Sequence, residues 1–186
     1  SFYNQNPDGP VNPTPTIGMV GLVGDVKDKM TLDFKNEGDT IFLVGNLYND
    51  LGCSEYLHQL KGVAHSPAPH FDIDEEFSLQ QSVKSLIANK LVDSAHDISE
   101  GGLITCLLEK GFNRSLGFEV KSVLADADGN KIREDAFWFG EAQSRVVVTV
   151  AENKVEQFKK TLEASKIAFT ELGKVITFPK RKLGPL

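Results

Sequence analysis

The stretch SAHDISEGGL, Ser94–Leu103, brings a histidine, two carboxylates, two hydroxyls and two adjacent glycines together between two apolar runs. The apolar run before it predicts a strand over 91–98, and apolar residues at helical spacing after it predict a helix over 100–110. A helix that starts just beyond a strand directs free backbone N–H groups into the space past the strand end, where an anion can bind. The stretch is therefore a candidate anion site.

Two adjacent glycines, Gly101 and Gly102, lie at the start of this expected helix. Without a Cβ atom, each allows the close approach of either a ligand or another backbone segment. Asp97 or Ser99 can cap the helix without taking part in any chemistry. The residues alone favour this structural interpretation, and a ligand site stays as the alternative.

The sequence GEAQSR at 140–145 follows the aromatic run AFWFG and precedes a β-branched stretch that predicts a buried strand over 144–150. Glu141 and Gln143 are two residues apart, so an extended chain places both on the same side. This carboxylate and amide either hold a polar substrate or satisfy backbone groups of neighbouring loops. The aromatic run is expected in the core or in an interface.

The histidines are weak candidates for metal ligands. His96 lies within a predicted strand, where a lone histidine is more often a hydrogen-bonded core residue than a ligand. A second group has the composition of a metal site but the spacing of no helix or hairpin, and prolines separate its histidines: His65, His70, Asp72 and Asp74. We therefore expect no metal site in this chain.

Alternating apolar patterns predict an α/β (α+β) fold in which helices cover a sheet. Strands are expected at 16–23, 39–45, 91–98, 117–124, 144–150 and 168–176. Helices are expected at 53–62, 74–91, 100–110 and 153–165. The proline-rich stretch 6–15 is expected to be a loop without regular structure, and DADGN at 126–130 a turn.

Composition excludes several classes of protein. The chain has 186 residues, a net charge of −6 and 40% apolar residues, which suffices for one sizeable core. Its only basic cluster is Lys180–Lys182, so we expect no nucleic-acid surface. No apolar run is long enough to span a bilayer, so we expect a cytoplasmic protein. Two cysteines make no disulfide framework, and we expect both Cys53 and Cys106 to be packed, reduced thiols.

Four motifs occur in a characteristic order: NPTPTIGMVGLVGDV, SEYL, DISEGGL and GEAQSRVVV. Together they resemble the C-terminal portion of the formylglycinamide ribonucleotide amidotransferase family, also called phosphoribosylformylglycinamidine synthases, in its small, synthetase-only form. The resemblance runs over nearly the whole chain. It implies a mixed sheet covered by helices, like the C-terminal domain of aminoimidazole ribonucleotide synthetase. The chain also begins without a methionine, and we expect a fragment.

The resemblance implies an ATP-dependent amidoligase of purine biosynthesis. Formylglycinamide ribonucleotide, ATP and glutamine-derived ammonia would give the amidine, ADP and phosphate, with ATP activating the formamide oxygen as an iminophosphate that ammonia displaces. ATP and Mg²⁺ would serve the full-length enzyme, and no cofactor is assigned to this fragment. The implied partners are the remaining domains of the polypeptide, a glutaminase subunit and a small accessory subunit, with neither nucleic acid nor membrane.

The family's site residues transfer only in part. Ser1 matches a serine that contacts substrate in the family. Asp97, Glu141 and Gln143 correspond to magnesium- and substrate-binding residues of the enzyme's first half, and in this second half they imply a degenerate site. Cys53 stands where the family usually has glycine. No catalytic residue and no metal ligand is assigned, and the fragment is expected to be inactive alone.

The resemblance also implies a division of the chain. Residues 1–26 would end an N-terminal-type, ATP-binding domain and form a linker, 27–178 would form the C-terminal-type domain, and 179–186 a tail. Two alternatives stay open: a noncatalytic scaffold that docks partner subunits, and another member of the aminoimidazole ribonucleotide synthetase superfamily.

Overall fold

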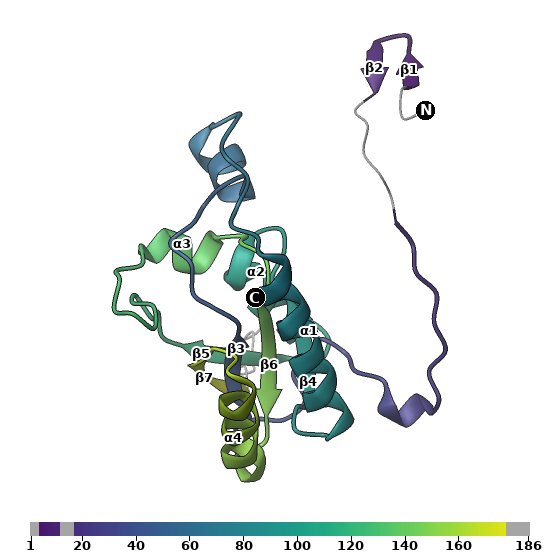
Figure 1. Ribbon diagram of the computed structural model, residues 1–186, viewed down its shortest axis with the longest axis vertical. Coiled ribbons are helices and arrows are strands. Elements are labelled where there is room, and N and C mark those ends of the chain that lie inside the picture. Colours follow the sequence, from purple (N-terminus) through teal and green to yellow (C-terminus); the bar gives the residue numbers. More distant parts are fainter. Residues whose placement is uncertain (1–3, 12–16, 178–186) are drawn as a thin grey trace, which may run out of the picture.

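A five-stranded antiparallel sheet organises the computed structural model, which describes residues 4–11 and 17–177 (Figure 1). The strand order is β4-β6-β3-β7-β5, and each of the four pairings is antiparallel. The strands are β3 (Thr40–Val44), β4 (Ser94–Asp97), β5 (Leu116–Val120), β6 (Val146–Val150) and β7 (Phe169–Thr177). The α/β (α+β) architecture is confirmed, and the expected mixed sheet is antiparallel throughout.

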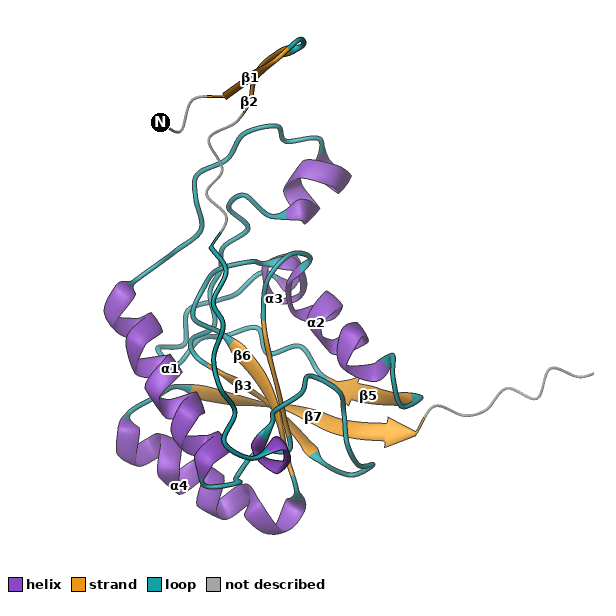
Figure 2. Cartoon of the chain, turned by 90° about the vertical axis from the view of Figure 1, so that its right-hand side faces the viewer, coloured by secondary structure: helices purple, strands orange, loops and turns teal. Residues whose placement is uncertain are grey.

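Two pairs of helices cover the two faces of this sheet (Figure 2). The helices α1 (Ile73–Ala88) and α4 (Val155–Ser165) lie on one face, and α2 (Gly102–Gly111) and the short α3 (Glu134–Phe139) lie on the other. Strand β3 is central, so both of its faces are covered and all five of its residues are buried. Ile41 and Leu43 point to the α2–α3 side, while Phe42 and Val44 point to the α1–α4 side.

Helix α1 follows from its sequence in a simple way. The Asp72 carboxylate caps its first turn, because one oxygen accepts the backbone N–H groups of both Asp74 and Glu75 at 2.9 Å. Leu79 and Leu86 are buried on the face that meets the sheet. The amphipathic helix expected at 74–91 is confirmed.

Most predicted elements are present within a few residues of their expected ends, and two predictions at the start of the chain are wrong. Residues 6–15 were expected to lack regular structure, but β1 (Asn4–Asn6) pairs with β2 (Gly9–Val11) in a hairpin. Pro-Asp followed by a glycine at φ +130° turns the chain there, so the turn-forming residues build a hairpin. The strand expected at 16–23 is absent from the described part, 17–23, where no other strand pairs with it.

The structure corrects two further expectations, the helix at 53–62 and the burial of both cysteines. The helix expected at 53–62 is a single π-helical turn, η2 (Tyr56–Leu60), stabilised by the hydroxyl of Ser54, which accepts the Leu57 N–H. Cys106 is buried as expected, but Cys53 is exposed, so only one of the two thiols is packed. The tail 179–186, with its basic cluster, lies outside the described residues. None of the described helices has the length and apolar character needed to cross a membrane.

Candidate functional site

The carboxylate of Glu141 joins three loops that are distant in sequence. Its Oε1 atom accepts the backbone N–H of Gly101 at 2.9 Å and the backbone N–H of Glu55 at 2.8 Å. These contacts connect the GEAQSR loop to the DISEGG turn, 40 residues away, and to the SEYL segment, 86 residues away. Three of the four sequence motifs therefore meet at one carboxylate oxygen.

The N-terminus of α2 is consequently occupied by a group of the protein itself. Gly101 is the N-cap residue, in the left-handed conformation at φ +83°, and offers no side chain. Neither of the expected side chains caps the helix. The side chain of Asp97 is 74% exposed and lies 3.5 Å from His96 Nδ1. Ser99 contributes its backbone carbonyl, which accepts the N–H of Gly102. At the position where the sequence predicts an anion, the Glu141 carboxylate accepts the N–H of the N-cap residue Gly101.

The glycine pair has a structural role. A Cβ on Gly102 would lie 2.7 Å from backbone atoms of Phe139, and a Cβ on Gly101 would lie 2.2 Å from the hydroxyl of Thr105. Gly102 also has φ +72°, which side chains rarely adopt. The glycines therefore allow the end of α3 to pack closely against the start of α2. The aromatic run supports this packing, since the ring of Phe139 stacks on that of Tyr56 at 4.8 Å and 10°.

Arg145 lies behind the GEAQ loop and is buried, with 3% of its surface exposed. Its Nε donates to the carbonyl of Ala142 at 3.0 Å, and its Nη2 donates to the carbonyl of Gly140 at 2.9 Å. Burial lowers its pKa to about 10, and the negative charge of Asp50 opposes this shift. Its backbone carbonyl accepts the N–H of Ile98, next to Asp97.

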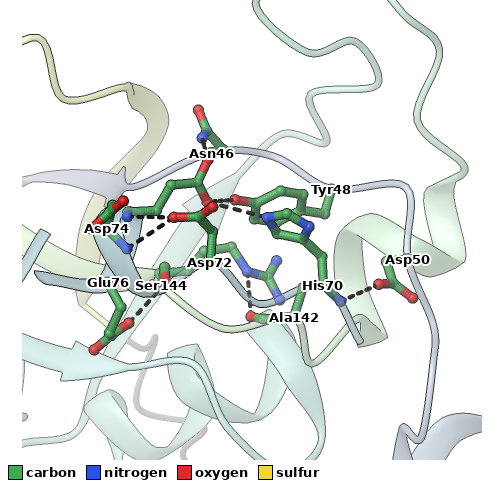
Figure 3. Close-up of polar contacts among 11 residues, drawn as sticks. Asn46, Tyr48, Asp50, His70, Asp72, Asp74, Glu76, Ala142 and Ser144 are labelled. Carbon is green, nitrogen blue, oxygen red and sulfur yellow. Dashed lines mark hydrogen bonds and ion pairs between the residues drawn. The ribbon is translucent and has the colours of Figure 1, made fainter. Parts of the chain in front are cut away.

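A second polar cluster lies at the carboxyl end of β3 (Figure 3). Glu75, in the first turn of α1, accepts from Asn46 Nδ2 at 3.0 Å and from Tyr48 Oη at 2.5 Å. His70 Nε2 lies 3.3 Å from the same carboxylate, and its ring stands 4.7 Å from that of Tyr48. Asp50 accepts the backbone N–H of His70 at 2.7 Å. The cluster thus fixes the segment before α1 to the end of β3.

The phenol of Tyr48 is held neutral in this cluster. Burial and, second to it, donation to the Glu75 carboxylate together raise its pKa to about 12. An open cleft of about 510 Å³ borders the cluster and is lined by the end of β3, the first turns of α1 and the α4–β7 loop. Asn46, Asp72, Glu75 and Lys166 are among its polar residues. Such a lining suits a polar ligand.

His96 is a hydrogen-bonded residue, with Nε2 2.7 Å from a Glu109 carboxylate oxygen, as expected. Gln143 is exposed and donates weakly, at 3.5 Å, to the backbone carbonyl of Glu141. No hydrogen bond or ion pair between described residues connects Asp97 to Glu141 or Gln143, although the loops that carry them are adjacent. Ser1 lies outside the described residues.

The described part of the chain contains no group of three or more His, Cys, Asp and Glu side chains that could hold a metal ion. His65 and the carboxylates of 72–74 do not converge with His70, because Asp72 serves as a helix cap and His70 faces Glu75. Sequence reasoning missed the roles of Asn46 and Tyr48. Their position directly after a fully buried strand was the available signal.

The whole sheet and both helical layers match a known domain family. A family model described as "AIR synthase related protein, C-terminal domain" matches residues 36–183. The chain belongs to this family. An AIR synthase related C-terminal domain therefore accounts for the five strands of the main sheet and for the four α-helices found in the described residues, while the hairpin and residues 17–35 precede the matched region.

Sequence relatives of this AIR synthase related domain are synthase subunits several times its length. The chain is 38% identical over 176 residues to phosphoribosylformylglycinamidine synthase subunit PurL of Alkaliphilus metalliredigens, covering 95% of the chain and 23% of the relative. It is 40% identical over 187 residues to the PurL subunit of Salinibacter ruber, covering 97% and 24%. The chain thus spans about a quarter of the length of these curated relatives.

Solved structures share the fold of this AIR synthase related domain. A structure of Thermotoga maritima PurL complexed with FGAR matches with a TM-score of 0.63 at 17% identity, over 83% of this chain and 26% of that one. The structure of PurLQS from the same organism matches with a TM-score of 0.61 at 17% identity, over 83% and 24%. At this identity the likeness establishes the fold.

Proposed function

We propose that this chain is the C-terminal part of a phosphoribosylformylglycinamidine synthase, an ATP-dependent amidoligase of purine biosynthesis. One observation carries the proposal: relatives named as PurL subunits match at 38% and 40% identity over 95% and 97% of the chain. The whole enzyme would convert formylglycinamide ribonucleotide, ATP and glutamine-derived ammonia into the amidine, ADP and phosphate. Another member of the superfamily is disfavoured because those relatives bear one name.

The chemistry would take place mainly on polypeptide that precedes this chain. ATP and Mg²⁺ are assigned to the whole enzyme, and solved PurL structures complexed with ATP and with ADP support the nucleotide. The described residues do not fit a complete Mg²⁺–ATP site: they contain no group of three or more His, Cys, Asp and Glu side chains that could hold a metal ion, and Glu141 accepts the Gly101 N–H at the start of α2. In this half, Asp97, Glu141 and Gln143 would form a degenerate site, and Ser1 would contact substrate.

The start of the chain supports a division into domains. Five apolar side chains in the extended segment 17–23 are each at least 65% exposed: Ile17, Met19, Val20, Leu22 and Val23. A stretch this apolar needs cover from another structure. We assign residues 1–26 to the end of an N-terminal-type domain and its linker, 27–178 to the C-terminal-type domain and 179–186 to a tail. The cover would come from the remaining domains of the same polypeptide.

The test compares the longer parent polypeptide with this chain. Supplied with formylglycinamide ribonucleotide, ATP and ammonia, the parent is expected to release ADP and phosphate and to form the amidine, while the 186-residue chain is expected to show no turnover. A parent without this activity, or turnover by the chain alone, would contradict the proposal.

A noncatalytic scaffold is the second candidate, favoured by the internally occupied α2 N-terminus and by exposed Phe71, Ile73 and Phe77 around the start of α1. In this case the chain would dock the other domains, a glutaminase subunit and a small accessory subunit. Calorimetry with Mg²⁺–ATP separates the two roles in this half. Heat of tight nucleotide binding to the chain would argue against a pure scaffold.

A further inference from the structure

The GEAQSR loop contains a buried cation, Arg145, that donates two side-chain hydrogen bonds within its own loop. The guanidinium of Arg145 donates to the carbonyls of Gly140 and Ala142, the two residues that flank Glu141. Among the described residues, no carboxylate forms an ion pair with Arg145, although its side chain is almost fully buried. Removing such a charge from water is expensive, so the position calls for a specific function.

We infer that Arg145 is a positioning residue that fixes the carbonyl groups of Gly140 and Ala142, the two neighbours of Glu141, and thereby aims the Glu141 carboxylate at Gly101 and Glu55. The planar guanidinium presents Nε and Nη2 along one edge, which matches two carbonyls that are two residues apart. Ala142 is fully buried, and a Cβ on Gly140 would lie 2.6 Å from the backbone carbonyl of Asp50. The loop between these anchors therefore has little freedom.

The consequence of this arrangement extends beyond the loop. The segment that follows Cys53 projects from the body of the domain, and most of its side chains are exposed (Figure 1). Its fixed points on the GEAQSR side are the Glu55 N–H on Glu141 and the ring of Tyr56 on Phe139. Arg145 would thus hold the SEYL segment in register with α2 through Glu141. What the ordered SEYL segment serves rests on the proposed function, whereas its positioning by Arg145 and Glu141 is a property of this chain alone.

Amide hydrogen exchange measured by NMR on the 186-residue chain tests the inference. Glu141→Ala is expected to speed exchange of the Gly101 and Glu55 amides by about tenfold or more, since each loses a charged acceptor. Arg145→Lys keeps the charge but presents a single donor point, and is expected to speed both amides by about fivefold. In the Glu141→Ala background, Arg145→Lys should add nothing, because the contact that it aims is already lost.

Phe158→Leu is the matched control, because it weakens the core on the opposite face of the sheet. It should leave the exchange of these two amides relative to their neighbours unchanged. If the two substitutions at 141 and 145 act independently, or if Arg145→Lys leaves both amides at the wild-type rate, the inference is wrong.

One measurement needs no variant. The Nε–H of Arg145 should exchange far more slowly than that of the exposed Arg114, and equal rates would overturn the inference even if Arg145→Lys fails to fold. All of these readouts are independent of turnover. A parent enzyme without the proposed activity would leave them untouched, so failure of the inference and failure of the proposed function are distinguishable.

Discussion

Lys110 offers the sharpest test of how this fold tolerates charge. Its side chain is fully buried, and its Nζ donates to the Leu32 carbonyl at 2.9 Å, the Ser94 hydroxyl at 2.9 Å and the Val147 carbonyl at 3.3 Å. None of these partners carries a charge. Burial lowers its pKa from 10.5 to about 8, which at 1.36 kcal/mol per unit corresponds to about 3 kcal/mol.

The sign of the pH dependence follows from proton counts. Below pH 8 the lysine is protonated in both the folded and the unfolded chain, so the full penalty of the buried charge acts on the folded state. Between pH 8 and 10.5 the unfolded state binds more protons than the folded state, so this group makes the free energy of unfolding rise with pH. The gain approaches about 1.4 kcal/mol per pH unit and about 3 kcal/mol in total.

Urea unfolding of the wild-type chain and of Lys110→Met measures this effect. Methionine nearly conserves the volume and cannot titrate, so the wild-type free energy of unfolding minus that of the variant should rise steadily from pH 7.5 to 10. Burial raises the pKa of the nearby Cys106 thiol to about 12, which has the opposite effect on stability above pH 9. Up to pH 10 the folded thiol stays protonated in both proteins, so this contribution cancels in the difference. A difference that stays flat with pH, or falls, would refute the reasoning.

Three further predictions concern packing and reactivity. Gly102→Ala should lower the free energy of unfolding, measured by urea titration, by about 2–4 kcal/mol. The reason is that the new Cβ would lie 2.7 Å from the backbone of Phe139 at a residue with φ +72°. An unchanged free energy of unfolding would mean that α2 and α3 can separate. Phe42→Ala should cost about 3–5 kcal/mol by the same assay, since the ring is fully buried in the central strand; a cost under about 1 kcal/mol would contradict this packing. At pH 8 a thiol reagent should label the exposed Cys53 quickly and the buried Cys106 only when the chain unfolds. Cys53→Ser should abolish the fast phase of labelling. Fast labelling of both cysteines would contradict the burial of Cys106 in α2.

The elements that could be predicted are those whose signal is local. Strand β3 is one apolar run between turn residues, and α1 has both a capping aspartate and apolar residues at helical spacing. Helix α3 was not predicted, because its six residues, five of them aromatic or acidic, give little periodicity, and packing against Gly102 stabilises it. The π-helical turn likewise depends on distant contacts, through Tyr56 and Glu55.

At the candidate site, too, the sequence predicts what depends on local signals and misses what depends on distant contacts. Glu141 was a candidate from its position before a buried strand, and the alternative that it satisfies loop backbone groups is the one observed. The identity of those groups was beyond prediction, because they lie 40 and 86 residues away and only the folded sheet brings them together. Asp97 was expected to act at the helix start, but the turn directs it into solvent.

The internal carboxylate has a consequence for ligand binding that the anion position alone would not suggest. A phosphate that entered the α2 N-terminus would displace Glu141 and sacrifice two hydrogen bonds to a charged acceptor, each contributing about 1.5–3 kcal/mol. An affinity penalty of about 100-fold or more follows, so inorganic phosphate at millimolar concentration should leave the Gly101 amide resonance of the wild-type chain unmoved. A saturable shift of that resonance would mean that the carboxylate yields to a ligand, and that this turn binds anions.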